Sequence, residues 1–471
     1  MSSKLRPTRR QTIAALATAP MFFLDRHGFG SLKSDRPNIV FIMADDLGYA
    51  DVSCYGRPDF KTPNIDRLAA EGMKFTQAYA NSAVCSATRT ALITGRYQYR
   101  LPVGLEEPLA DPKYHAGLPP QHPTLPSLLK KVGYGTTLVG KWHLGWLPDY
   151  GPLQSGYEHF YGFRGGAVDY FTHKPGTEPA ASEDLWDQDA PVHQAGYLTE
   201  LLGDRAVSVI QGYGREQRPF LLSLHFNAPH WPWEGPGDEA ESKRISSLRD
   251  YDGGSQATYA RMVEAMDRQV GRVIDALATA HLTENTIVIF TSDNGGERFA
   301  DTWPFTGKKS ELLEGGLRIP AIIRWPGHIR PGGASDQVMI TMDWFPTLLE
   351  AAGAQPDAAF PSDGMSLLTT LTGDVPPIPR KLYWRFHSNA QRAMRDGDMK
   401  WLKIRGNTFL FNVVSDPLER ANLKEREPQV YRRMVAEYDA WNGTMLPENP
   451  SSYSERINGK QWADHYGDVP D

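Results

Sequence analysis

The sequence predicts an α/β fold with a mainly parallel central sheet flanked by helices, followed by a smaller C-terminal α+β domain. Apolar runs without polar alternation, such as 38–44 and 286–291, are typical of strands that are covered on both faces in a parallel sheet. Helical segments separate these runs, and alternation of helix and strand is the pattern of α/β proteins. Ligands of such sheets bind beyond the carboxyl ends of the strands.

Each element is predicted from its apolar pattern and from the residues that begin or end it. Thr62-Pro63 and Thr124-Leu125-Pro126 are typical helix starts, and Gly72 and Gly133 end those helices. From Tyr259 onward, apolar residues recur every three or four positions, which predicts a long amphipathic helix. The predicted strands lie at 38–44, 136–139, 220–224, 286–291 and 319–325.

The remaining segments predict the domain organisation. Residues 149–191 are rich in glycine, aromatic and acidic residues without a period, so we expect excursions over the site. A Pro- and Gly-rich linker at 373–379 precedes three short antiparallel strands and a helix, at 382–387, 399–404, 408–411 and 429–441. We therefore expect a leader at 1–35, an α/β catalytic domain at 36–375 and a C-terminal α+β subdomain at 376–471.

Composition excludes some partners. The 471 residues carry a net charge of −6, so no polyanion is expected to bind and nucleic acid is excluded as a partner.

Thr8-Arg9-Arg10 before an apolar run at 13–24 resembles a twin-arginine export signal, which predicts a periplasmic or secreted protein. That run is too short to span a membrane. The alternative is an ordinary flexible terminus.

A helix from Val84 to Gly95 is predicted to place Cys85 at its N-terminus, with Gly95 as the left-handed residue that ends it. Free N–H groups and the helix dipole favour a sulfate, a phosphate or a thiolate at that position, and Arg89 lies one turn further on. The alternative is a small buried cysteine in a core helix. Cys54 is the second cysteine and could pair with Cys85 in an exported protein.

Acidic and amide side chains follow two of the predicted strands. Asp45 and Asp46 end one strand, and Asp293 and Asn294 end another. If the strands are neighbours, three carboxylates about 5 Å apart repel by roughly 3 kcal/mol per pair at an effective dielectric of about 20. A cation must then lie between them, or their pKa values must rise. Oxygen ligands suit Ca²⁺, with Mg²⁺ less favoured, while ordinary turn or cap residues are the alternative.

The segment Cys85-Ser86-Ala87-Thr88-Arg89, followed by 92–97, closely resembles the signature of type I sulfatases in the alkaline-phosphatase-like superfamily. In that family the cysteine of Cys-x-Pro/Ala-x-Arg is oxidised to formylglycine by a maturase. Further segments match in family order, at 37–40, 62–68, 140–145, 226–232, 314–320, 393–397 and 416–423. The resemblance implies formylglycine at position 85 and, in consequence, no disulfide between Cys54 and Cys85.

The resemblance also implies a role for each matching residue. Asp45, Asp46, Asp293 and Asn294 correspond to the family's Ca²⁺ ligands. Lys141, Lys309 and Arg89 would hold the sulfate, with Lys309 preferred to the adjacent Lys308. Hydrated formylglycine would attack sulfur, His230 or Lys309 would protonate the leaving alcohol, and His143 would take the proton that regenerates the aldehyde. These roles predict hydrolysis of sulfate monoesters, either sulfated carbohydrates or aryl sulfates.

Two other functions remain open from the sequence. A cation-lined pocket would also accept a phosphoryl group, as in a phosphonate or phosphate ester hydrolase with the same aldehyde. A protein in which Cys85 stays a thiol would bind sulfate without turnover. For the pocket rim we expect Asp169, Tyr170, His173, Trp231 and Trp233, because aromatic residues suit a sugar or an aryl group. Simple loop packing is the alternative for these five residues.

Overall fold

The computed structural model describes residues 36–110, 115–177, 181–249, 253–373, 375–450 and 452. The predicted export signal therefore lies outside the described residues. The central sheet contains β1 (Asn38–Ala44), β2 (Met73–Phe75), β4 (Gly135–Lys141), β5 (His159–Phe163), β6 (Trp186–Asp187), β7 (Ala190–Pro191), β8 (Phe220–His225), β9 (Thr286–Ser292), β10 (Ala321–Arg324) and β11 (Gly333–Ser335).

These strands are arranged in the order β11-β2-β10-β9-β1-β8-β4-β5-β6-β7. Five consecutive strands in the middle of the sheet, from β9 to β5, are all parallel. β10 runs antiparallel to both of its neighbours, and the β6–β7 edge is also antiparallel. A second, two-stranded sheet pairs β3 (Ala78–Tyr79) with β12 (Met339–Ile340).

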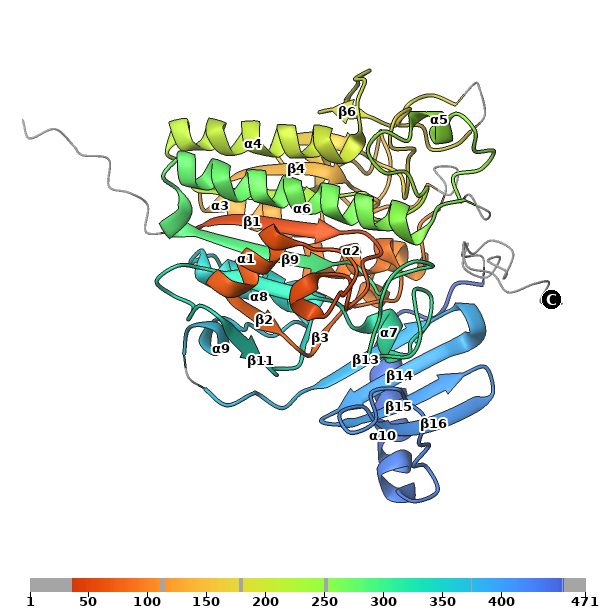
Figure 1. Ribbon diagram of the computed structural model, residues 1–471. Coiled ribbons are helices and arrows are strands. Elements are labelled where there is room, and N and C mark those ends of the chain that lie inside the picture. The colour runs from red at the N-terminus through yellow and green to blue at the C-terminus, as the bar shows by residue number, and fades with distance from the viewer. Residues whose placement is uncertain are drawn as a thin grey trace, which may run out of the picture. The chain divides into compact units, whose positions relative to one another are not determined.

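Helices cover both faces of the central sheet (Figure 1). In chain order they are α1 (Pro63–Glu71), α2 (Cys85–Thr94), α3 (Leu125–Lys131), α4 (Leu198–Glu216), α5 (Glu239–Ser242), α6 (Gln256–Thr279), α7 (Glu314–Leu317), α8 (Trp344–Ala351), α9 (Leu368–Thr372) and α10 (Pro428–Asn442). The long helices α4 and α6 lie side by side along one face (Figure 1).

The central strand β1 shows why its sequence is apolar after Asn38. Val40 and Ile42 pack in a core with residues of α1, α4 and α6. Ile39 and Phe41 belong to a second core, formed with α2, α3 and α8 on the other face. Because side chains alternate between the faces of a strand, a strand covered on both sides has no polar position.

The helix starts and stops follow local chemistry, with one cap supplied from a distance. Thr62 precedes α1 as predicted but does not cap it with its side chain. Instead, the Asp267 carboxylate on α6 accepts hydrogen bonds from the backbone N–H groups of Asn64 and Ile65. Gly95 ends α2 with a φ of 68°, in the left-handed region that favours glycine.

A four-stranded antiparallel sheet forms the C-terminal part, with α10 packed on it. Its strands are β13 (Lys381–Phe386), β14 (Gln391–Asp396), β15 (Met399–Ile404) and β16 (Asn407–Asn412). Trp384 and Phe386 share a core with Ala87 and Ala91 of α2. The C-terminal sheet and the helix that begins at Cys85 therefore share one hydrophobic core.

The predicted fold class is confirmed, although the sequence analysis missed several elements. β5 lies within 149–191, which we expected to hold only excursions, because its aromatic run was read as loop composition. The 319–325 strand is present as β10 but is antiparallel. β14 and the 19-residue helix α4 were not predicted. The predicted boundary between residues 375 and 376 stays a prediction.

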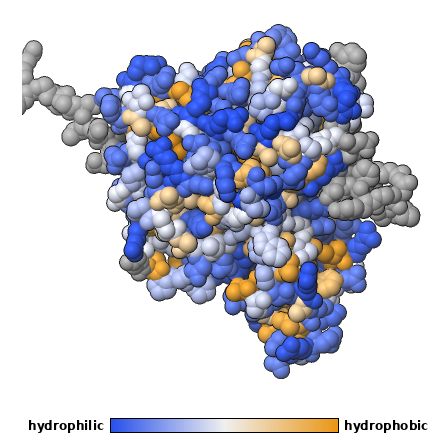
Figure 2. Space-filling model, in the orientation of Figure 1, coloured by the Kyte–Doolittle hydropathy of each residue, from blue (hydrophilic) through white to orange (hydrophobic). Residues whose placement is uncertain are grey.

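Hydrophilic residues cover most of the face shown in Figure 2, and hydrophobic residues form small separate groups there. Such scattered apolar positions are usual on a protein surface. Among the residues that the structure describes, no helix is both long and apolar enough to cross a membrane.

Candidate active site

The site forms where β1 and β9 end side by side. The two strands are parallel and in register, with Ala44 opposite Ser292, so the residues that follow them emerge together at the carboxyl edge of the sheet. The backbone N–H of Asp46 donates to Asp293 Oδ1 at 3.3 Å, and Asn294 Nδ2 donates to Asp46 Oδ1 at 2.7 Å. The predicted convergence of Asp45, Asp46, Asp293 and Asn294 is confirmed.

Three cationic side chains neutralise the three carboxylates of this cluster. Lys141 Nζ lies 2.6 Å from Asp45 Oδ2, and Lys309 Nζ lies 2.6 Å from Asp46 Oδ2. Arg89 donates to Asp293 Oδ2 through Nε and Nη2, at 3.0 and 2.8 Å. Charged groups this deeply buried are tolerated only because they are paired.

The donor atoms of the cluster fit a hard divalent cation. Asp45 Oδ1 and Asn294 Oδ1 are buried and have no hydrogen-bond partner among the described residues. Burial, together with the neighbouring Asp293, raises the pKa of the Asp45 carboxyl well above its usual range. A cation bound by these oxygens would satisfy both atoms and favour the ionised carboxylate. Oxygen donors are the ligands preferred by Ca²⁺ and Mg²⁺.

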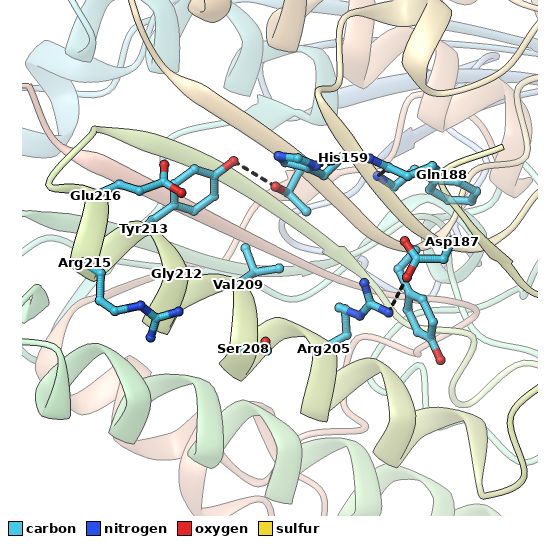
Figure 3. Close-up of a pocket in the computed structure, with 13 residues that line it drawn as sticks. His159, Asp187, Gln188, Arg205, Ser208, Val209, Gly212, Tyr213, Arg215 and Glu216 are labelled. Atoms are coloured by element: carbon cyan, nitrogen blue, oxygen red, sulfur yellow. Dashed lines mark hydrogen bonds and ion pairs between the residues drawn. The ribbon is translucent and has the colours of Figure 1, made fainter. Parts of the chain in front are cut away.

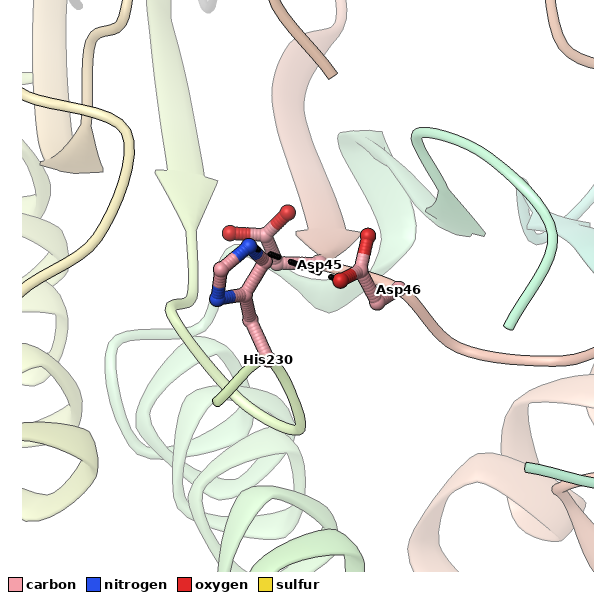
Figure 4. Close-up of side chains that lie close together, drawn as sticks. All are labelled: Asp45, Asp46 and His230. Carbon is pink, nitrogen blue, oxygen red and sulfur yellow. Dashed lines mark ion pairs between the residues drawn. The ribbon is translucent and has the colours of Figure 1, made fainter. Parts of the chain in front are cut away.

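His230 reaches the same cluster from the loop that follows β8. Its Nε2 lies 3.5 Å from Asp46 Oδ2, and Figure 4 shows the imidazole beside the carboxylates of Asp45 and Asp46. The other ring nitrogen, Nδ1, lies 2.7 Å from the Trp231 carbonyl oxygen. Since a carbonyl only accepts, Nδ1 carries the hydrogen and Nε2 presents its lone pair to the site. Burial and the nearby Lys309 hold the pKa of His230 well below its usual range.

Cys85 is the first residue of α2, and it lies against the acidic cluster. Its Sγ and oxygen atoms of Asp45 and Asp293 all lie within 4.8 Å of one another. The expectation that this position favours a thiolate is wrong for the cysteine itself, because burial raises the pKa of the Cys85 thiol. Cys54 and Cys85 are both free, so the disulfide alternative is not formed.

His143 follows β4 and also faces the cavity. Its backbone has a φ of 57°, a left-handed conformation that is uncommon outside glycine and is often found at functional sites. Nε2 lies 2.6 Å from the Leu109 carbonyl oxygen and therefore carries the hydrogen. Nδ1 is buried without a partner in the described part of the chain. Burial and then Lys141 keep the pKa of His143 well below its usual range.

A cavity of about 630 Å³ opens over these groups. Cys85, His143, His230 and Lys309 line its floor together. Part of its wall comes from 165–167, 175–177 and 182–186, within the segment expected to pass over the site. The rest comes from 108–110, 146 and 246–249, which the sequence analysis did not assign to the site. The prediction that 149–191 passes over the site therefore agrees with part of this wall. The 108–110 and 246–249 segments carry no motif, so no sequence signal identified them.

Of the five expected rim residues, one lines the cavity and the other four make contacts within the loops. Trp231 lines the cavity, with its ring 4.2 Å from that of His230 between centroids. Asp169 accepts hydrogen bonds from Phe171, Thr172 and Ser242, and Tyr170 donates to the His230 carbonyl oxygen. His173 bonds to the Gly196 carbonyl, and Trp233 packs against Phe299. The geometry favours loop packing for these four residues.

Another cavity, of about 310 Å³, lies between α4 and the β5–β6 edge of the sheet (Figure 3). Arg205 and Asp187 on its wall form an ion pair at 2.7 Å, and Tyr213 bonds to Thr137. None of the predicted site residues lines it. Of these two cavities, only the larger one is lined by predicted site residues.

Comparisons with known proteins agree with this geometry. The sulfatase family model matches residues 37–354, and the model for the C-terminal part of N-sulphoglucosamine sulphohydrolase matches residues 305–437. Mouse N-acetylgalactosamine-6-sulfatase is 33% identical over 82% of this chain and 76% of its own length. Mouse arylsulfatase J is 29% identical over 94% of this chain and 82% of its own length.

A solved structure shows the same architecture. The crystal structure of Ps i-CgsB in complex with k-i-k-neocarrahexaose superposes with a TM-score of 0.80 at 31% identity, covering 89% of this chain and 95% of that one. The family match extends over most of the chain and includes every residue of the site described above. The chain therefore belongs to the sulfatase family and is a sulfuric ester hydrolase.

Proposed function

We propose that this sulfatase hydrolyses sulfate monoesters of carbohydrates, and accepts simple aryl sulfates in assays, by means of a formylglycine made from Cys85. The observation that carries the proposal is the meeting of one nucleophile position, two imidazoles and Lys309 at one cavity floor, above the acidic cluster that also holds Lys141 and Arg89. Phosphate and phosphonate esters are the rival substrates for such a site.

The wall of the cavity supports a saccharide as the substrate. Trp146, Trp186 and Trp231 all line it, and aromatic faces pack well against sugar rings and aryl groups. A volume of about 630 Å³ exceeds what a sulfate group alone requires. The relatives point the same way, because one is named for N-acetylgalactosamine-6-sulfate and the solved structure holds a neocarrahexaose.

The cations of the acidic cluster account for binding of the sulfate group. Lys141, Lys309 and Arg89 provide the positive charge that the sulfuryl oxygens require as the S–O bond breaks. Asp45, Asp46, Asp293 and Asn294 would hold Ca²⁺, which supplies further neutralisation of that charge. With the cation on the carboxylates, the lysines would be released from their ion pairs to hold the substrate.

The two imidazoles and Lys309 account for the proton transfers. Formylglycine supplies, as its hydrate, two hydroxyl groups on one carbon, one to attack sulfur and one to expel sulfate afterwards. His143 presents an unpaired Nδ1 and stays neutral at neutral pH because its pKa is lowered, so it is suited to accept the proton of the second hydroxyl. Lys309 or His230 would deliver a proton to the leaving alcohol.

The cell biology of the protein belongs to the same proposal. We infer that the enzyme is periplasmic or secreted after twin-arginine export, and that a formylglycine-generating maturase acts on Cys85. The segment that carries Thr8-Arg9-Arg10 supports the first inference. The Cys85–Arg89 pattern at the start of α2 supports the second.

The first prediction concerns the side chain at position 85. Peptide mapping of the purified protein is expected to show a mass below that of the thiol form, as required for conversion to an aldehyde. Cys85→Ala is expected to lower kcat on nitrophenyl sulfate by roughly three orders of magnitude or more, because it removes the nucleophile. Cys54→Ala is the matched control and should keep wild-type turnover, and an unshifted mass in an active enzyme would refute the formylglycine.

The second prediction concerns the metal. Added Ca²⁺ is expected to raise the Tm of the metal-stripped protein, because only the folded site binds the ion. At a Ca²⁺ concentration of about a hundred times Kd, the free energy of unfolding should increase by about 3 kcal/mol. Asn294→Ala should reduce this Ca²⁺-dependent shift. Asn81→Ala is the control, since Asn81 is also fully buried and accepts a hydrogen bond from Met342 outside the site. Equal Ca²⁺ shifts in both variants would contradict the assignment.

The third prediction separates the proposed substrate from its rival. With nitrophenyl sulfate and a nitrophenyl phosphonate compared on one preparation, kcat/KM is expected to be higher for the sulfate ester. A preference for the phosphonate would show that the cation-lined floor serves phosphoryl transfer. If the protein binds sulfate esters but turns over neither substrate, it is instead a non-catalytic protein.

A further inference from the structure

The loop that carries Lys309 has no regular secondary structure to fix it. We call residues 306–313 the Lys309 loop; it lies between β9 and α7. Its backbone is tied to the catalytic part by two hydrogen bonds, from Lys309 N to the Gly296 oxygen and from Ser310 N to the Ala83 oxygen, both 2.9 Å. Ser310 has a φ of 70°, a conformation that costs free energy outside glycine and persists only where neighbours hold it.

Gln391, at the start of β14 in the C-terminal sheet, holds the other side of this loop. Its amide oxygen accepts from the Leu312 N–H at 2.8 Å, and its amide nitrogen donates to the Ser310 carbonyl at 2.9 Å. The same nitrogen also donates to the Ser388 carbonyl at 3.1 Å. Gln391 is 1% exposed, and its bond to the Leu312 N–H is buried, so loss of that bond would be costly.

Other contacts of the C-terminal part hold both ends of the Lys309 loop. Thr306 Oγ1 donates to the Leu418 carbonyl at 2.8 Å. At the other end, Lys400 Nζ lies 2.9 Å from carboxylate oxygens of both Glu314 and Glu419. The Glu314 N–H donates to the second oxygen of Glu419 at 2.7 Å. The loop is therefore fixed at its start and its end, and Gln391 acts between these points.

We propose that Gln391 is a positioning residue for sulfate binding: through Ser310 and Leu312 it fixes the backbone from which Lys309 reaches the active site. The proposal rests on the proposed function, because it takes Lys309 as a ligand of the sulfate group. The C-terminal sheet then contributes to the active site without a side chain in the cavity.

Gln391 would act by pre-organisation of the Lys309 loop. Lys309 Nζ lies 2.6 Å from Asp46 Oδ2 at the end of a long, flexible side chain. The position of this ammonium group therefore depends on where the Lys309 backbone lies. Removal of the Gln391 amide would leave the buried Leu312 N–H and the part-buried Ser310 carbonyl without this partner. The strained backbone at Ser310 would relax, and the ammonium group would lose its fixed place in the site.

The experiment uses the full chain, loaded with Ca²⁺, and measures the calorimetric Kd for inorganic sulfate together with kcat and KM on nitrophenyl sulfate. Gln391→Met keeps the size of the side chain and removes both polar atoms. We expect this variant to raise the Kd for sulfate about tenfold, because one well-placed interaction with the sulfate is lost. In a Lys309→Ala background the same change should have no further effect on Kd, because the two residues act as one unit.

Gln337→Met is the matched control. Gln337 is fully buried, and its amide likewise bridges backbone atoms, donating to the Ile378 carbonyl at 3.1 Å and accepting from the Ile378 N–H at 2.7 Å. Gln337→Met should lower the Tm by about as much as Gln391→Met does. Its Kd for sulfate should stay within twofold of the wild-type value. If Gln391→Met fails to fold, Gln391→Asn keeps an uncharged amide on a side chain one methylene shorter, which no longer spans Ser310 and Leu312 together, and it should show a smaller rise in Kd.

The outcomes distinguish the two levels of the argument. A wild-type protein that neither binds sulfate nor cleaves the ester would overturn the proposed function. A wild-type protein that does both, with an unchanged Kd in the folded Gln391 variant, would overturn the role of Gln391. Equal effects of the Gln391 change with and without Lys309 would also overturn it, because the effect would then not pass through Lys309.

Discussion

The structure depends on the parallel pairing of β1 with β9. Because the two strands are in register, Asp45 and Asp46 emerge beside Asp293 and Asn294, although about 250 residues separate them in the sequence. This pairing requires β1 to be buried on both faces, which explains its apolar sequence. A slip of one residue would move every side chain of β1 to the opposite face and separate the four oxygen donors.

The close approach of three carboxylates determines the rest of the site. Lys141, Lys309 and Arg89 each contact one of them, so the groups assigned to sulfate binding also make burial of the acids tolerable. Each cation comes from a different part of the chain: a strand end, a loop and a helix. The loop is the least regular of these, and Gln391 of the C-terminal sheet hydrogen-bonds to its backbone.

The sequence predicted the parts of this protein that depend on local pattern. The buried strands, the glycine that ends α2 and the acids at the strand ends follow from periodicity and backbone chemistry, and the residue roles came from the family resemblance. The 108–110 and 246–249 walls of the cavity could not be predicted, since loop positions depend on tertiary packing rather than on period. Asp169, Tyr170 and His173 were expected at the rim because of their type, whereas their contacts place them in loop packing.

The central claim is that a modified side chain at position 85 lies beside a divalent ion held by the ends of β1 and β9. A crystal structure of the mature protein, grown with Ca²⁺ and inorganic sulfate, tests it most directly. We predict an ion about 2.3 to 2.6 Å from oxygens of Asp45, Asp46, Asp293 and Asn294, next to an oxygen-bearing side chain at 85. An intact thiol, with the carboxylates bound only by Lys141, Lys309 and Arg89, would contradict it.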